Sequence, residues 1–115
     1  LLPTTEFWLL ENGMKVGLLQ LRHRPSHSAG LPADFANHIF YEIEKEQRGR
    51  GLGQKILQLG LLEARKINLK EVILVCDENN LASQKIIEKN GGKLVGKFLN
   101  PETQVTVLKY VIKLV

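Results

Sequence analysis

The sequence is short of cysteine, with Cys76 alone among 115 residues. A single cysteine excludes an intrachain disulfide framework and favours a reducing compartment, so we expect a cytoplasmic protein. No apolar run approaches the ~20 residues that a membrane-spanning helix needs. The opening segment LLPTTEFWLLENG lacks the basic start and cleavage site of a signal peptide. These absences predict a chain that is not inserted in a membrane.

Positive charge is present but not concentrated in one segment. The net charge is +4, and the Lys and Arg residues are scattered along the chain. A dedicated nucleic-acid-binding protein more often carries a basic stripe or a recognisable reader motif. The charge pattern therefore disfavours nucleic acid as a partner and favours an anionic small ligand. The hydrophobic fraction of 43% predicts one globular domain over residues 1–115 with a single core.

Metal ligands are scarce as well. His23 and His27 lie close together in RHRPSH, but no further Cys or His completes a ligand set, so we predict no metal site. Cys76 lies inside a continuous apolar run, where packing is a commoner role for a thiol than nucleophilic attack.

Local patterns predict a strand-rich amino-terminal half. Asn12-Gly13 separates two apolar runs and is a strong hairpin signal, because both residues tolerate positive φ. Strands are therefore predicted at residues 6–10 and 15–23. Residues 24–37 collect two prolines and small polar residues without periodicity, which indicates a loop and a candidate substrate-side flap.

A third strand and a helix follow this loop. Residues 37–47 alternate in polarity, with Ile39, Tyr41 and Ile43 on one face and His38, Phe40, Glu42 and Glu44 on the other. Residues 54–67 then carry a broad apolar stripe with helical spacing, which suits a helix packed on a sheet.

The last third of the chain predicts two more strands around a second helix. The apolar run at residues 71–78 reads as a buried strand, and Asn80 is an N-cap for a helix that stops at residues 90–92. A final hairpin turns at residues 100–103. The predicted fold is α/β (α+β), a mixed, mostly antiparallel central sheet with helices on its faces.

Glycines and arginines alternate between the third strand and the first helix, at Arg48, Gly49, Arg50, Gly51 and Gly53. A helix N-terminus has N–H groups without intrahelical partners and the positive end of the helix dipole, which together attract anions. Glycines let an anion approach these N–H groups, and arginines add positive charge. The turn is therefore a candidate pyrophosphate cradle.

Two common phosphate-binding motifs do not match this turn. A Walker loop needs Lys-Ser/Thr after its last glycine, whereas Gly53 is followed by Gln54-Lys55-Ile56. The glycine spacing of the Rossmann fingerprint is also absent.

The remaining pattern, Arg48-x-x-Gly51-x-Gly53, resembles the coenzyme A signature of the GNAT N-acetyltransferase superfamily. The segment CDENNLASQKIIEKNGG is similar to the second characteristic segment of that superfamily, with Asn80 and Ser83 at its matching positions. The resemblance covers about residues 5–115, and the segments 44–66 and 72–92 are its specific parts. It implies a GNAT-like fold and acetyl-CoA as co-substrate.

The resemblance also implies roles for individual residues. Main-chain N–H groups of the turn and helix start would hold the pyrophosphate of acetyl-CoA, namely those of Arg48, Gly49, Arg50, Gly51, Leu52, Gly53 and Gln54. The strand end at residues 41–46, with Tyr41 and Ile43, would pair through its main chain with the pantetheine arm. Asn80 would reach the pantetheine or the thioester, and Ser83 the phosphate side, with Lys85 adding charge.

The resemblance implies acetyl transfer to a primary amine by direct attack. This reaction needs a base for the amine proton and an acid for the leaving thiolate. Glu42 is the first candidate base and His38 the second, since they share a strand face near the expected acetyl site. Many relatives carry the acid as a Tyr on the second helix, where this chain has Ile87. Water or Tyr110 are the alternative candidates for the acid.

The amino-terminal end also departs from the family pattern. The usual first strand and helices of the acceptor wall are absent before Thr5, and the chain starts at Leu1 without Met, so we expect a missing upstream segment. Homodimerisation would also cover the surface left open. The acceptor stays open between a small amine, an antibiotic, a peptide N-terminus and a protein lysine. The alternative function is a degenerate module that binds coenzyme A or a protein partner without turnover.

Overall fold

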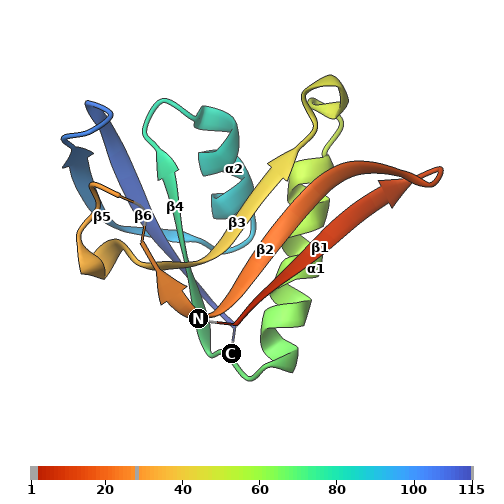
Figure 1. Cartoon of the computed structure of the whole chain (residues 1–115), viewed down its shortest axis with the longest axis horizontal. Coiled ribbons are helices and arrows are strands. Elements are labelled where there is room, and N and C mark those ends of the chain that lie inside the picture. The colour runs from red at the N-terminus through yellow and green to blue at the C-terminus, as the bar shows by residue number, and fades with distance from the viewer. Residues whose placement is uncertain (1–2, 28, 115) are drawn as a thin grey trace.

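The computed structural model describes residues 3–27 and 29–114. Their strands form two three-stranded sheets, with the order β1-β2-β3 in sheet A and β4-β6-β5 in sheet B (Figure 1). The elements in chain order are β1 (Thr4–Glu11), β2 (Met14–Ser26), a 3-10 turn (Ala33–Phe35), β3 (Asn37–Ile43), a second 3-10 turn (Lys45–Gln47), α1 (Leu52–Lys66), β4 (Glu71–Asp77), α2 (Leu81–Lys89), β5 (Lys93–Asn100) and β6 (Val105–Lys113).

The predicted α+β class is confirmed, with antiparallel sheets and two helices. The single predicted sheet is divided in two, however, because β3 and β4 lie side by side without a hydrogen-bonded ladder between them. The third strand is also shorter than predicted: it ends at Ile43, and residues 45–47 turn as a 3-10 helix.

Both hairpins form at the predicted turns. Asn12 and Gly13 adopt φ values of 53° and 79°, which suits the two-residue turn whose twist matches the flanking strands. The second hairpin joins β5 to β6, and its turn is closed by a hydrogen bond of 2.8 Å from Gln104 N–H to the Asn100 carbonyl.

Helix α1 packs on sheet A through small and branched residues on one face. Leu57 and Ala64 are fully buried, and Gly60 lies against Leu19 of β2, so that a Cβ atom at Gly60 would stand 2.4 Å from Leu19 Cδ1. None of the helices in the described ranges is long and apolar enough to cross a membrane.

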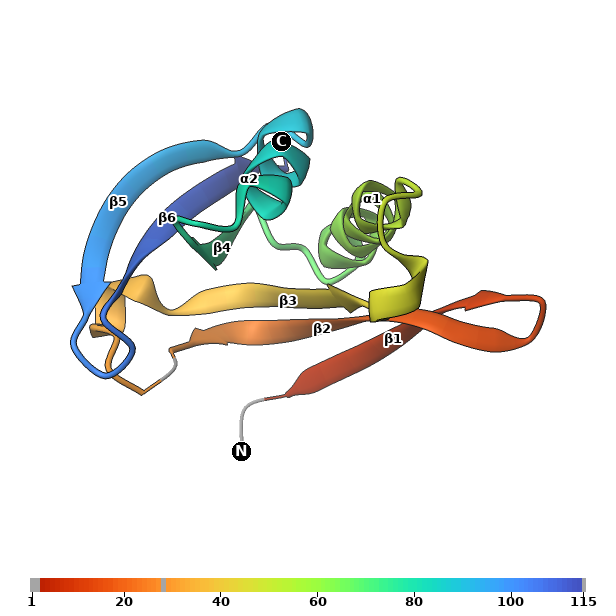
Figure 2. The same cartoon turned by 90° about the horizontal axis from the view of Figure 1, so that it is seen from above.

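The register of sheet A decides which side chains α1 covers. Leu19, which faces α1, pairs with Phe7 and Tyr41, so these three share the covered face. Trp8 and Phe40 point to the opposite face and are 59% and 45% exposed. Figure 2 shows both helices on the same side of the molecule and no helix of the described chain below sheet A.

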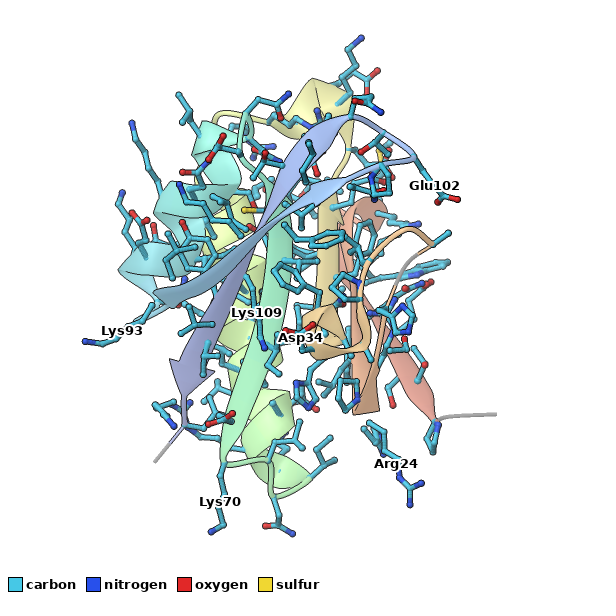
Figure 3. The ribbon with its side chains drawn as sticks, turned by 90° about the vertical axis from the view of Figure 1, so that its left-hand side faces the viewer. Arg24, Asp34, Lys70, Lys93, Glu102 and Lys109 are labelled. Atoms are coloured by element: carbon cyan, nitrogen blue, oxygen red, sulfur yellow. The ribbon has the colours of Figure 1, made fainter. Side chains whose placement is uncertain are left out.

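The segment predicted as an unstructured loop at residues 24–37 is partly ordered against sheet B. β2 continues to Ser26, and Phe35 is buried with Leu31 and Val107 in a small second core. The rings of Phe35 and Phe98 lie 5.9 Å apart, and Lys109 Nζ stands 5.9 Å from the Phe35 ring. Figure 3 shows the neighbouring Asp34 and Lys109 on this side.

Substitution of Gly60 tests the close approach of α1 to sheet A. We expect Gly60→Val to lower the free energy of unfolding by about 1–3 kcal/mol, because the added carbons overpack against Leu19. Urea denaturation measures the loss. Gln58→Val is the matched control, since Gln58 is exposed on the same helix and carries the same β-branched penalty. Equal losses for the two variants would contradict the close packing.

Candidate active site

Strands β3 and β4 run side by side in the same direction and diverge toward their carboxyl ends (Figure 1). Near their amino ends the imidazole of His38 joins them, because the Ile73 N–H donates to His38 Nδ1 at 3.0 Å. Nδ1 can accept only when it carries no proton, so His38 is neutral in this arrangement. His38 is buried, and burial lowers its pKa below the ordinary value.

The edge of β3 that faces β4 carries main-chain groups outside any ladder. The Glu44 N–H donates to the Val16 carbonyl at 2.9 Å, which fixes the even-numbered residues of β3 as those bonded to β2. Alternation along an antiparallel pair then turns the N–H and C=O groups of Tyr41 and Ile43 the other way. The Ile43 carbonyl agrees, since it accepts from Arg48 Nε at 3.1 Å beyond the strand end.

The facing edge of β4 is open in the same way. The Glu78 N–H donates to the Thr106 carbonyl of β6 at 2.8 Å, so the alternate residues Val75 and Asp77 turn their main-chain groups away from β6, on the side of β3. The Asp77 carbonyl accepts from the Asn80 N–H at 2.9 Å, so the open part of this edge is the main chain of Val75 and the Asp77 N–H. Two diverging strand edges with available main-chain donors and acceptors can pair with an extended ligand laid between them.

The Gly-rich turn lies just beyond the end of β3 and leads into α1. Gly49 and Gly51 adopt φ values of 81° and 78°, and a Cβ atom at either position would meet nothing within 4 Å. Backbone conformation therefore demands glycine at both positions, and the space above them is open.

The amino end of α1 suits an anion for an independent reason. Its N-cap, Gly51, makes no side-chain cap, and the first turn holds no acidic residue. The first intrahelical bond runs from Lys55 N–H to the Gly51 carbonyl at 3.2 Å, so the N–H groups of Leu52, Gly53 and Gln54 precede the helical ladder. Together with the helix dipole, these donors favour a phosphate group.

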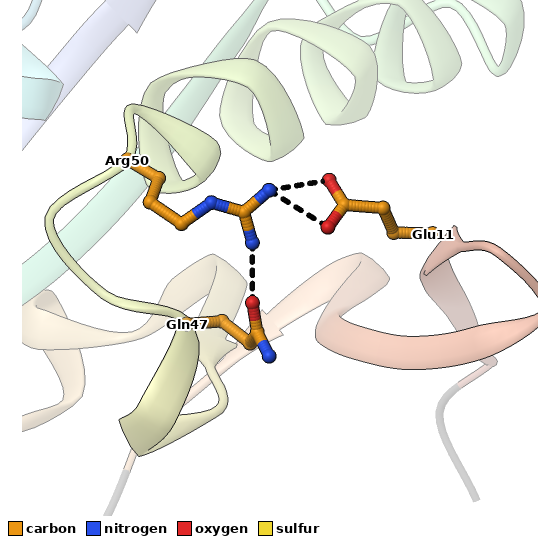
Figure 4. A network of polar contacts seen from close by, with 3 residues as sticks. All are labelled: Glu11, Gln47 and Arg50. Atoms are coloured by element: carbon orange, nitrogen blue, oxygen red, sulfur yellow. Dashed lines mark hydrogen bonds and ion pairs between the residues drawn. The ribbon is translucent and has the colours of Figure 1, made fainter.

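The side chain of Arg50 is bound to other protein groups and does not point freely into the turn, as a phosphate ligand would. Its guanidinium donates to both carboxylate oxygens of Glu11, at 2.7 and 2.8 Å, and to the side-chain oxygen of Gln47 (Figure 4). This ion pair is exposed and contributes ~0.2–1 kcal/mol. Arg50 thus ties the turn to the β1–β2 hairpin. Arg48 lies against the end of β3 through its bond to Ile43.

The start of α2 lies near the diverging strand ends. Asn80 is the N-cap, as predicted, and its Oδ1 accepts from the Ser83 N–H at 3.1 Å. The Ser83 hydroxyl lies 2.9 Å from the Tyr41 hydroxyl, and Ser83 partly offsets the raised pKa of the neighbouring Cys76 thiol. Ser83 thus contacts Tyr41, and its assignment to the phosphate side of the cofactor stays a prediction. Lys85 is exposed on α2.

The candidate catalytic residues lie apart from one another. Glu42 is exposed on the face of sheet A that points away from α1. His38, expected on that same exposed face, is instead buried against Ile73 because sheet B covers it. Tyr110 is buried, and its hydroxyl donates to Glu88 Oε2 of α2 at 3.0 Å. Burial and this carboxylate raise the pKa of Tyr110 to about 12. Ile87 is fully buried.

Sequence reasoning missed three side-chain contacts at this site: His38 with Ile73, Arg50 with Glu11, and Tyr41 with Ser83. The predicted alternation of the third strand carried a signal for the last contact. This alternation places Tyr41 on the same face of β3 as Ile39 and Ile43, which is the face that the helices cover.

Other features of the described residues do not add to this site. No group of three His, Cys, Asp or Glu is placed to hold a metal ion within residues 3–27 and 29–114. An apolar cavity of about 670 Å³ lies between β1 and α1, lined by Phe7, Leu9, Leu59 and Leu62 among others. It is separate from the diverging strand ends, since none of its lining residues belongs to β3, β4 or α2.

Residues 3–93 match the model of the acetyltransferase (GNAT) domain family. The chain belongs to this family. A 49-residue segment is 33% identical to the mycothiol acetyltransferase of Geodermatophilus obscurus, covering 43% of this chain and 16% of that protein.

Two solved structures show that the fold is that of GNAT acetyltransferases. The chain superposes on yncA of Salmonella typhimurium, which was solved with its cofactor acetyl-CoA, with a TM-score of 0.76 at 17% identity. The superposition covers 91% of this chain and 61% of the yncA chain. The chain also superposes with a TM-score of 0.70 at 20% identity on AAC(6')-Ib, solved with ribostamycin and coenzyme A, over 96% of this chain and 64% of that one. The chain thus spans less than two thirds of these chains.

The buried imidazole of His38 predicts a dependence of stability on pH. Burial holds its pKa below the ordinary 6.5, so below that pH the unfolded chain binds a proton that the folded chain excludes. Stability from neutral His38 is complete above about pH 6.5 and declines as the pH falls toward its lower folded pKa.

We expect His38→Gln to remove this pH-dependent component while keeping a side-chain acceptor for Ile73. Urea unfolding at about pH 7.5 and about pH 5.5 measures the change, with the exposed His23→Gln as control. A parent and a His38→Gln variant that lose the same stability on acidification would show that His38 is not held neutral.

Proposed function

We propose that this chain binds acetyl-CoA between β3, β4 and the amino end of α1, and transfers the acetyl group to a primary amine by direct attack. The proposal is carried by the strand edges at Tyr41 and Val75, whose main-chain groups lie outside the ladders of the two sheets, and by the uncapped helix N-terminus to which these edges lead. Membership of the GNAT family supports it, and so do yncA and AAC(6')-Ib, which were solved with acetyl-CoA and coenzyme A.

The chemistry of the residues present fits this co-substrate. The main-chain N–H groups from Arg48 to Gln54 would bind the pyrophosphate, and the edge of β3 at Tyr41 and Ile43 would bind the amides of the pantetheine arm. Asn80, whose N–H donates to the Asp77 carbonyl at the end of β4 at 2.9 Å, would contact the same arm. Acetyl-CoA, when bound, supplies an acetyl group activated as a thioester.

A base is needed because only a neutral amine attacks a thioester. We assign this role to Glu42, whose carboxylate lies on the uncovered face of sheet A, beside the open edge of β3. An acceptor can approach the strand edges from that face without displacing a helix. For His38 we propose a structural role at the junction of β3 and β4, because its Nδ1 is already occupied.

The acceptor belongs to the class of small-molecule or peptide primary amines. Ribostamycin, present in the AAC(6')-Ib structure, is one compound to include in an acceptor screen. The first test is calorimetric titration with acetyl-CoA, desulfo-coenzyme A and ATP. We expect micromolar binding of both coenzyme A forms and much weaker binding of ATP. Failure of both coenzyme A forms to bind would refute the proposed function.

Gly51→Glu tests the anion site at the turn. The substitution places a carboxylate against the first N–H groups of α1, so we expect at least a tenfold loss of coenzyme A affinity by calorimetry, which is ~1.4 kcal/mol. Gly91→Glu is the matched control, because Gly91 has φ 89° and equally open surroundings at the far end of α2. Similar affinities for the two variants would show that the turn does not hold the phosphates.

Glu42→Gln tests the assignment of the base. We expect acetyl transfer to slow by ~10²-fold, the usual contribution of a general base, while the Kd for coenzyme A stays within twofold of the parent. Glu46→Gln is the control, since Glu46 is an exposed carboxylate a short distance along the chain. Equal transfer rates in all three proteins would remove Glu42 from this role.

A further inference from the structure

Three elements contribute polar side chains to one point at the diverging strand ends. Tyr41 of β3 and Ser83 of α2 share a hydrogen bond of 2.9 Å between their hydroxyls, and the thiol of Cys76 of β4 lies near both side chains. Ser83 is itself held in place, because its N–H donates to the Asn80 cap. The Tyr41 hydroxyl is therefore fixed where β3, β4 and α2 meet.

Tyr41 is also the residue whose main chain faces the open edge of β3. Its hydroxyl and a ligand lying along that edge would thus be neighbours. Tyr110, the second of the two tyrosines of this chain, is directed elsewhere, because its hydroxyl donates to Glu88. Ile87, on the buried side of α2, has no proton to give.

We propose that Tyr41 is the general acid of this site and that Ser83 is its proton relay, an inference that rests on the proposed function. As the amine nitrogen forms its bond to the acetyl carbon, the carbon–sulfur bond breaks and its electron pair goes to sulfur. Tyr41 Oη gives its proton to that sulfur. The proton that the nitrogen loses passes to Glu42 and on to solvent, and solvent returns a proton to Tyr41 through Ser83.

The proton balance of this step is closed, with no additional reactant. A phenol is a weaker acid than a thiol, so the proton must reach Tyr41 Oη from Ser83 as the first one leaves. The direct contact between the two hydroxyls provides this route. Burial raises the pKa of Tyr41 and keeps the phenol protonated at neutral pH.

A spectroscopic test does not depend on acetyl transfer. In the Tyr110→Phe background, incorporation of 3-fluorotyrosine labels Tyr41 alone, since the chain has two tyrosines. We expect coenzyme A to shift the single ¹⁹F resonance in a way that desulfo-coenzyme A, which lacks the sulfur, does not reproduce. Identical spectra with the two bound ligands would overturn the proposal and leave coenzyme A binding intact.

Kinetics provide the second readout. Tyr41→Phe keeps the ring and removes the hydroxyl, so we expect kcat to fall ~10²-fold with the Kd for coenzyme A within twofold of the parent. Ser83→Ala should show a smaller fall in kcat. Tyr110→Phe, which also loses a buried and hydrogen-bonded hydroxyl, should keep the parent kcat.

The outcomes separate the two proposals. Loss of coenzyme A binding in the parent chain would refute the proposed function and with it the role of Tyr41. Parent binding and transfer with an unchanged kcat for Tyr41→Phe would refute the role of Tyr41 alone. A fall in kcat shared equally by Tyr41→Phe and Tyr110→Phe would indicate a structural effect and also refute it. Thermal unfolding of each variant confirms that the compared proteins are folded.

Discussion

The hydrogen bond from Ile73 N–H to His38 Nδ1 marks the point where two sheets meet without becoming one. A side-chain acceptor takes the place of a main-chain carbonyl there, so the ladder that would join β3 to β4 does not propagate. Buried main-chain groups without partners cost ~1–3 kcal/mol each, which is why the strands diverge at once and leave their edges to solvent or a ligand. The site exists because no ladder of main-chain hydrogen bonds joins β3 to β4.

The two ends of the site are coupled by close helix packing. Gly53, in the first turn of α1, lies so near α2 that a Cβ atom there would stand 2.7 Å from Ile86 Cδ1. The beginning of α1 is thus packed directly against α2. On the outer side, the bonds of Arg50 to Glu11 and Gln47 hold the same turn to the β1–β2 hairpin. A ligand entering this site meets a turn that is ordered beforehand, which lowers the entropy lost on binding.

Local chemistry explains what the sequence could predict. Asn12-Gly13 and the Asn80 cap each indicate a local backbone conformation through the residue type itself, and both form as predicted. The division of the sheet could not be read in this way, because alternation assigns side chains to faces but does not say which strand edges pair. The ion pair of Arg50 could not be predicted either, because its partner Glu11 lies 39 residues away in the chain.

The half-buried thiol of Cys76, near Tyr41 and Ser83, bears on the chemical selectivity of the site. Burial raises the pKa of Cys76 to about 11, so almost none of it is thiolate at neutral pH. Only thiolates exchange readily with thioesters, and a neutral thiol at this position is a poor competitor for an acetyl group. Under the proposed function, the raised pKa of Cys76 would protect the chain from acylating itself and leave an incoming amine as the effective nucleophile.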